Sequence, residues 1–348
     1  MARPFVFVAI LFIFQHSVAQ PYVFYKRNKI TVETLDSPAV SIESFPLLEK
    51  EKHTVRINVP ENESWNFTVN LKNIKNDTAE FNAADTILFI SDMEGQFGLL
   101  RELLINNKVI NEKYEWTFGS NQLIVCGDLF DRGAQVIQQL WLLYKLESIA
   151  AASGGSVHIL LGNHEIMNLS GDLRYMAPQY YDHARLLDKD YMELFNENTE
   201  LGKWLRSKNI IMRAGPFLCV HGGISKEILN KKISIAAMNE MARPWLDRWK
   251  QDIPEYVSVL FGENSPFWYR GYFDEPMDKQ KLVAATLEKY KVEKIIVGHT
   301  IRNVVASYYD GKVWDINTNW HEDNAQGLLV EKEKFYRVDN KGMKTEIQ

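Results

Sequence analysis

Six side chains of metal-binding type follow short apolar runs of the sequence, and they are Asp92, Glu94, Asp128, Asn163, His221 and His299. The set holds carboxylates, one amide and imidazoles but no thiolate, which suits hard or borderline divalent ions. Six ligands are too many for one catalytic ion with an open position, but they suit two ions that share a bridging carboxylate. Such a pair stabilises the attacking and leaving oxygens of an in-line displacement. These residues therefore predict hydrolysis of a phosphate ester.

Three further polar residues in the same stretches have natural roles in that reaction. Arg132 can bind phosphate oxygens through its planar guanidinium. His164 directly follows Asn163 and could protonate the leaving oxygen as a general acid. Asp131 could then keep the imidazole of His164 oriented and protonated. Alone, Asp131 and Arg132 would be interpreted as a surface ion pair, but beside this ligand set we expect them to serve the reaction.

The elements that must position these side chains form a repeated pattern of strand, polar loop and helix. Apolar runs typical of buried strands end just before the polar residues, and they span residues 86–90, 123–126, 157–161, 217–220 and 294–297. Helical periodicity follows the first run, and a second helical stretch continues to about residue 151. A lone aspartate after a strand is commonly a helix cap. Five such endings instead favour an active site at the strand ends of an α/β sheet.

Several motifs resemble those of a known enzyme family. GDLFDRG at 127–133, GNHE at 162–165 and HGG at 221–223 are similar to the core motifs of the phosphoprotein phosphatase branch of calcineurin-like metallophosphoesterases. GHT at 298–300 resembles the last ligand motif of the bacterial-type members. NLSGDLRY at 168–175 resembles the Shewanella-like phosphatase group. The resemblance spans roughly residues 87–330.

The resemblance implies a fold and a division of the ligands between two ions. The expected fold class is α/β (α+β), a metallophosphoesterase β-sandwich of two mixed sheets flanked by helices, with the dimetal site at the strand ends. The first ion would be bound by Asp92, Glu94 and Asp128, with Asp128 bridging. The second would be completed by Asn163, His221 and His299.

The resemblance also implies roles for the remaining site residues. His164 would be the catalytic acid and Asp131 its orienting partner. Arg132 would bind the substrate phosphate. Arg270 would do the same by its order along the chain, although its aromatic surroundings, FWYRGY at 267–272, leave a packing role open.

Position 94 departs from the family pattern. The first family motif is Gly-Asp-x-His-Gly, whereas this chain reads Ser91-Asp92-Met93-Glu94-Gly95. A glutamate can bind Mn²⁺ or Mg²⁺ through oxygen, and an all-oxygen first site should favour Zn²⁺ less and make its water harder to ionise. The alternative is that Glu94 does not bind and the first ion is lost.

The chain is expected to have three parts. Residues 1–19 are predicted to be a cleaved signal peptide, because an apolar run of ten residues follows Arg3 and Ser17-Val18-Ala19 ends at a small residue. Residues 20–84 contain period-two alternation and turn residues, which predict a small β-rich extension. Residues 85–348 would form the phosphoesterase domain.

Composition limits where the protein acts and what it binds. The net charge of −5 argues against binding of a nucleic-acid polymer. No later apolar stretch is long enough for a stable membrane span after signal cleavage. The signal peptide predicts a secreted or periplasmic protein. Cys126 and Cys219 lie in apolar runs and are interpreted as two core thiols, with a disulfide left open.

The sequence thus predicts a dimetal phosphomonoesterase that uses a metal-bridging hydroxide. We expect Mn²⁺, with Fe, Mg²⁺ and Zn²⁺ as alternatives. The substrate would be a phosphoprotein or a small phosphoester, and the signal peptide weakens the phosphoprotein hypothesis because cytosolic kinases would not supply it. One alternative is hydrolysis of phosphoanhydrides such as dinucleoside polyphosphates. The other is a binding module that has lost turnover through Glu94.

Overall fold

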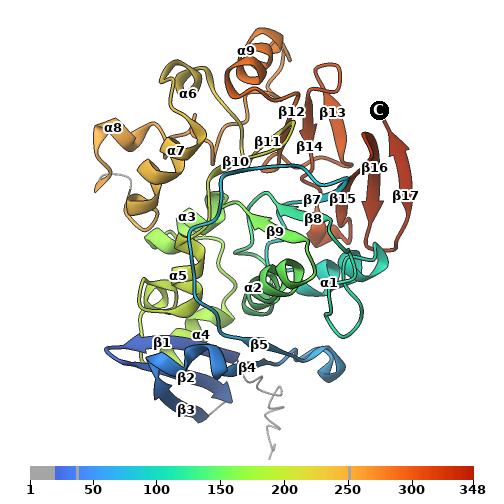
Figure 1. The fold of residues 1–348 in the computed structure, drawn as a ribbon. Coiled ribbons are helices and arrows are strands. Elements are labelled where there is room, and N and C mark those ends of the chain that lie inside the picture. Colours follow the sequence, from blue (N-terminus) through green and yellow to red (C-terminus); the bar gives the residue numbers. More distant parts are fainter. Residues whose placement is uncertain (1–19, 37–38, 250–251) are drawn as a thin grey trace, which may run out of the picture.

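The computed structural model describes residues 20–36, 39–249 and 252–348, and its centre is a sandwich of two mixed sheets (Figure 1). The predicted signal peptide lies outside the described residues. One six-stranded sheet has the order β17 (Lys344–Ile347), β16 (Lys334–Asp339), β15 (Gln326–Glu331), β7 (Thr86–Ile90), β8 (Gln122–Val125), β9 (Ser156–Ile159). The other has the order β13 (Ala306–Tyr308), β14 (Val313–Asp315), β12 (Lys294–Val297), β11 (Phe217–Val220), β10 (Ile211–Ala214), β6 (Glu80–Phe81).

The central strands are buried on both faces, which explains their continuous apolar runs. Successive side chains of β7 point to opposite faces because a strand has a period of two. Ile87 and Phe89 enter the core between the sheets, whereas Leu88 and Ile90 enter the core beneath the outer helices. Cys126 and Cys219 lie in the inter-sheet core as free thiols. The prediction of a β-sandwich with flanking helices is confirmed.

Helices cover the outer faces of the sandwich and form a separate covering layer (Figure 1). Strands β7, β8 and β9 are parallel and are connected through α1 and α2. The helices are α1 (Phe97–Asn106), α2 (Val136–Ala152), α3 (Asn163–Ser170), α4 (Gln179–Leu186), α5 (Glu200–Arg206), α6 (Lys226–Asn230), α7 (Ile235–Ala242), α8 (Glu255–Ser258) and α9 (Gln280–Tyr290). Strands and helices thus alternate along much of the chain, as the sequence pattern predicted.

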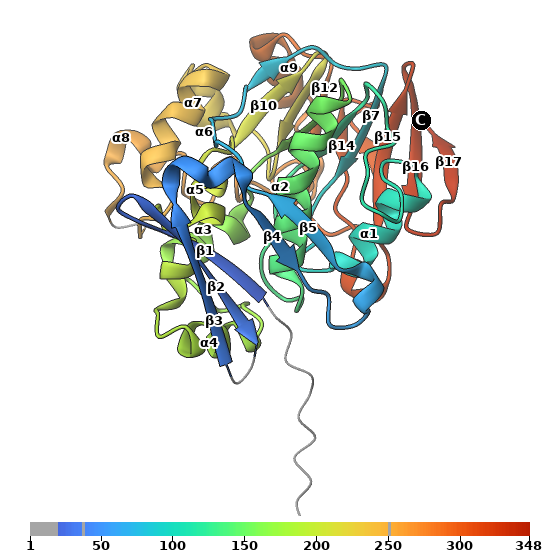
Figure 2. The ribbon, with the colours of Figure 1, turned by 60° about the horizontal axis from the view of Figure 1, so that its bottom comes forward.

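The β4–β5 hairpin explains why α2 is apolar on nearly every side. Strands β4 (Thr54–Ile57) and β5 (Phe67–Asn70) pair antiparallel and lie beside α2 (Figure 2). The backbone N–H of Lys72 donates to the hydroxyl of Tyr144, 2.8 Å away, and the Lys145 ammonium donates to the carbonyl of Thr68 at 2.8 Å. The helix is therefore covered by the hairpin on one side and by the sheet on the other.

The first three strands form a sheet against the covering helices α4 and α5 (Figure 1). These strands are β1 (Gln20–Lys26), β2 (Lys29–Asp36) and β3 (Ala39–Pro46). The N–H of Tyr25 donates to the carbonyl of Asn198 at 2.7 Å, and Lys50 pairs with the buried Glu200 at 3.0 Å. Farther along, β6 pairs with β10 of the sandwich. Residues 20–84 are thus joined to the rest of the chain by backbone and ionic contacts.

Candidate metal centre

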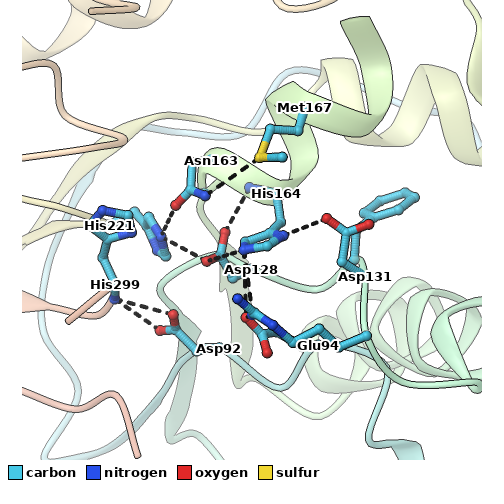
Figure 3. A network of polar contacts seen from close by, with 12 residues as sticks. Asp92, Glu94, Asp128, Asp131, Asn163, His164, Met167, His221 and His299 are labelled. Carbon is cyan, nitrogen blue, oxygen red and sulfur yellow. Dashed lines mark hydrogen bonds and ion pairs between the residues drawn. The ribbon is translucent and has the colours of Figure 1, made fainter. Parts of the chain in front are cut away.

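Loops that leave the strand ends bring the ligand-type side chains together (Figure 3). Asp92 and Glu94 follow β7, Asp128 follows β8, and Asn163 begins α3 soon after β9. His221 and His299 follow β11 and β12 of the other sheet. Candidate ligand atoms converge in two buried groups, Asp128–His221–His299 and Glu94–Asp128–His164, each within 4.8 Å. Both groups contain Asp128, the residue predicted to bridge two ions.

The loops that carry these residues have an unusual backbone. Six site residues have positive φ between 43° and 76°, and they are Asp92, Glu94, Asp128, Asp131, Arg132 and His299. This left-handed region costs a non-glycine residue roughly 1–2 kcal/mol, so the surrounding contacts must hold each residue there. Close packing also explains two neighbouring glycines. A Cβ at Gly162 would lie 2.2 Å from an Asp128 carboxylate oxygen, and one at Gly298 would lie 2.4 Å from Asp92.

Glu165 holds two of these loops together from below. Its buried carboxylate accepts backbone N–H donors from Gly162 at 2.6 Å, from Asp128 at 2.9 Å and from Leu129 at 2.6 Å. Burial and the charge of Asp128 raise the pKa of Glu165 to about 7. All these contacts are to backbone atoms, so the glutamate of the GNHE motif fixes the loops.

Asp128 and His221 form the middle of the cluster. Oδ2 of Asp128 lies 3.1 Å from Nε2 of His221, and Oδ1 accepts the N–H of His164 at the start of α3, at 2.9 Å. Nδ1 of His221 lies 2.7 Å from the carbonyl oxygen of Cys126. That contact fixes a proton on Nδ1, so Nε2 would present its lone pair to an ion that displaces the second proton. Asn163 Oδ1, 3.0 Å from the same Nε2, offers an oxygen beside it.

The charges of the cluster shift the pKa values of its members. Burial would lower the pKa of His221, but Asp128 and Asp92 outweigh burial and raise it to about 9. Burial would raise the pKa of Asp128, but His221 and His164 hold it well below its usual range. Burial lowers the pKa of His299 to about 2, helped by the charge of His221, so His299 is a neutral imidazole available as a ligand.

The two carboxylates of the first motif are each held from outside the cluster. Asp92 Oδ1 accepts the side-chain N–H of Asn317 at 2.8 Å, and its carboxylate also accepts the N–H of His299. Glu94 pairs with Arg132 through one oxygen, and its other oxygen lies 2.9 Å from Nε2 of His321. Asn317 and His321 were not identified from the sequence, where neither residue belongs to a recognisable motif.

His164 faces the cluster with one ring nitrogen and a supporting network with the other. Nδ1 lies 2.5 Å from Asp131 Oδ2, whereas Nε2 lies 3.6 Å from Glu94 Oε1 (Figure 3). Burial would lower the pKa of His164, but Asp128 and Asp131 raise it to about 9. Asn168 extends the network, because it donates to Asp131 at 2.8 Å and accepts the hydroxyl of Tyr191 at 2.7 Å. A protonated, oriented imidazole is the arrangement a general acid needs.

The two predicted phosphate-binding arginines lie at the edge of the cluster. Arg132 pairs with Glu94 and stacks 5.2 Å from the ring centre of the half-exposed Tyr175. Arg270 donates from Nη1 to the carbonyl of His299 at 2.6 Å. Burial lowers the pKa of Arg270, while the nearby Asp92 and Asp128 oppose that shift. Both guanidiniums thus contact residues of the cluster, Arg132 through Glu94 and Arg270 through His299.

The residues present fit a pair of divalent ions. The buried donor atoms are carboxylate oxygens, one amide oxygen and imidazole nitrogens, which together suit Mn²⁺, Fe, Mg²⁺ or Zn²⁺. Burial of several carboxylates so close together is costly unless cations compensate the charge. The cluster therefore has the ligand types of a metal centre and a buried negative charge that cations would compensate.

Comparison with known proteins agrees with this geometry. A crystal structure of a cold-active protein-tyrosine phosphatase from a psychrophilic Shewanella species is 31% identical, with a TM-score of 0.86 over 94% of this chain and 98% of that one. Shewanella-like protein phosphatase 2 of Arabidopsis thaliana is 26% identical over 71% of this chain and 74% of its own length. A symmetrical bis(5'-nucleosyl)-tetraphosphatase of Neisseria meningitidis is 26% identical over 52% of this chain and 58% of its own.

The family assignment confirms the resemblance in the motifs. Residues 85–303 match the calcineurin-like phosphoesterase family, and this range contains all six ligand-type residues. Members of this family use a dimetal centre. The chain therefore belongs to the calcineurin-like phosphoesterase family and is a metal-dependent phosphatase of that family.

Proposed function

We propose that the protein is a two-metal phosphomonoesterase that acts outside the cytoplasm. The observation that carries this proposal is the convergence of two ligand groups on Asp128, beside the His164–Asp131 pair. Two ions held by the six ligand-type residues would supply Lewis acidity and an activated water at neutral pH. Mn²⁺ is the ion we expect, because the first motif offers oxygen ligands only.

The residues around the ions have separate tasks in this proposal. Arg132 and Arg270 bind the non-bridging phosphate oxygens and orient the phosphorus for in-line attack. His164, protonated and held by Asp131, donates its Nε2 proton to the leaving oxygen. Asn168 and Tyr191 keep Asp131 turned toward the imidazole. When the substrate binds, Arg132 either releases Glu94 or contacts Glu94 and the phosphate together.

A groove next to the centre supports a substrate larger than phosphate. Its volume is about 430 Å³, and it is lined by α3 and by the segments that carry Trp249 and Trp268. Met167 connects it to the centre, since its sulfur lies 3.9 Å from the Asn163 amide nitrogen. The relative of 31% identity is a protein-tyrosine phosphatase, so we propose a phosphorylated side chain of a protein as the substrate class.

The first experiment uses p-nitrophenyl phosphate and metal-stripped protein. Hydrolysis that returns when Mn²⁺ is added supports the phosphatase, and its absence with every divalent ion supports a binding module. Phosphotyrosine and phosphoserine peptides, nucleotides and dinucleoside polyphosphates then compete as substrates. The tetraphosphatase similarity makes phosphoanhydride hydrolysis the second candidate function. Faster turnover of dinucleoside polyphosphates than of any phosphopeptide would select it.

The place of action remains a proposal from the first residues of the sequence. Within the described residues 20–36, 39–249 and 252–348, no helix has the length and apolar character that a membrane crossing requires. We propose cleavage before Gln20 and export of the remainder. Expression of the full chain, followed by N-terminal sequencing of the exported protein, tests this, and an intact Met1 would contradict it.

A further inference from the structure

The loop after β14 contacts the first motif, residues 91–95, although it lies more than 200 positions later in the sequence. It runs from Asp315 through the short 3₁₀ helix at Trp320–Glu322. Internal contacts fix its shape, because Asp315 accepts the N–H of Asn317 at 3.1 Å and the buried Trp320 anchors the helix. This loop supplies both outer contacts of the first motif, Asn317 to Asp92 and His321 to Glu94.

The contacts of His321 define which ring nitrogen carries a proton. Nδ1 lies 2.7 Å from the side-chain amide nitrogen of Gln96, which can only donate, so Nδ1 accepts. Nε2 therefore carries the hydrogen and donates it to Glu94 Oε2 at 2.9 Å. A ligating carboxylate is commonly oriented by such an outer partner, as a ligating histidine is.

The position of Arg132 indicates what the contact between His321 and Glu94 does. It pairs with Oε1 of Glu94, the oxygen that lies 3.6 Å from Nε2 of His164 on the cluster side. With Arg132 as its sole partner, the carboxylate would be free to turn toward the phosphate-binding edge. A donor on Oε2 restrains the carboxylate from the other side, so Oε1 stays available to an ion when Arg132 turns to phosphate.

We propose that His321 is a positioning residue that holds Glu94 as a ligand of the first ion. The chain thus places a carboxylate at position 94 and an imidazole behind it, where the family motif has an imidazole at 94. Glu94 and His321 would act as one unit although 227 positions separate them. The inference rests on the proposed two-metal function.

Metal binding, measured apart from catalysis, tests the proposal. The purified protein is stripped of metal and titrated with Mn²⁺, and free Mn²⁺ is followed by its electron paramagnetic resonance signal. We expect two ions on the parent and ~10–100-fold weaker binding of one of them in His321→Ala. His321→Gln should recover much of the loss, because its amide can still donate to Glu94. Glu322→Ala, the next residue of the same 3₁₀ helix and an exposed one, is the matched control.

A double-mutant cycle shows whether His321 acts through Glu94. Once Glu94→Gln has removed the carboxylate, His321→Ala should weaken Mn²⁺ binding little further. An equal loss in both backgrounds, or a His321→Gln variant as weak as His321→Ala, overturns the proposal. Parent-like binding of both ions by His321→Ala also overturns it and leaves the proposed function standing. A parent that binds fewer than two ions instead refutes the proposed function. Circular dichroism of each stripped variant checks that the fold is retained.

Discussion

Replacement of His164 by alanine separates proton transfer from metal binding. Nε2 of His164 lies 3.8 Å from Asp128 Oδ2 and Nδ1 lies 2.5 Å from Asp131, so the ring is positioned between the cluster and its support. A pKa of about 9 keeps it protonated at pH 7. General acids of this kind contribute ~10²–10⁴-fold in rate, which corresponds to about 3–5 kcal/mol of transition-state stabilisation.

The size of the effect should depend on the leaving group. Phenyl phosphate releases a phenolate about as basic as that of tyrosine, whose pKa is roughly 10, and should lose the full factor in His164→Ala. p-Nitrophenolate hardly needs a proton, so its release should slow much less. The assay compares kcat for the two substrates with Mn²⁺ content measured on the same samples. Equal losses for both substrates with both ions retained would remove His164 from the acid role.

Asp131→Asn provides a matched variant that keeps the ring in place. Asparagine can still accept from Nδ1 but carries no charge, so the pKa of His164 should fall. Because the acid works only while protonated, the alkaline limb of the pH–rate profile should move to lower pH. An unchanged alkaline limb would show that Asp131 does not set the protonation of His164.

Three other outcomes follow from the charges and ligands of the centre. Asp128→Asn should abolish turnover and lower metal content at both sites, and two retained ions with a near-normal rate in metal analysis would sink the bridging assignment. Glu94→Gln should lose activity, and high Mn²⁺ should restore part of it. Glu94→His should shift the metal preference toward Zn²⁺ and the pH–rate profile to lower pH. If both variants match the parent in metal content, metal preference and pH–rate profile, Glu94 is not a ligand. Metal-stripped protein should lose stability as pH rises from about 6.5 to about 9, because folding raises the pKa of His164 and His221 to about 9 and favours their protonated forms. A melting temperature that increases over that window would contradict the last expectation.

The sequence best predicted which side chains converge where a strand end carries the residue. Asp92, Asp128 and His299 each follow an apolar run within a few residues, so strand order and a turn are enough to gather them. The same runs indicated buried strands of an α/β sheet, because strands buried on both faces have continuous apolar sequences. The two-sheet sandwich itself was expected from the family resemblance.

The supporting contacts were beyond sequence reasoning for a physical reason. Asn317 and His321 reach the first motif from a loop more than 220 positions away, and neither has a spacing that periodicity could reveal. Asn168 was noted only as part of a motif, and its bond to Asp131 depends on how α3 packs. The burial of α2 by the β4–β5 hairpin likewise depends on tertiary packing, and the sequence predicted only a helical stretch there.

The most direct test of the two-metal phosphatase is the number of bound metal ions per chain at which activity appears. Stripped protein is titrated with Mn²⁺ while phosphate release from p-nitrophenyl phosphate and bound Mn²⁺ are measured in the same samples. We expect turnover to appear with the second bound ion per chain and to be lost again on chelation. Full activity in stripped protein, or with one bound ion per chain, would contradict the account.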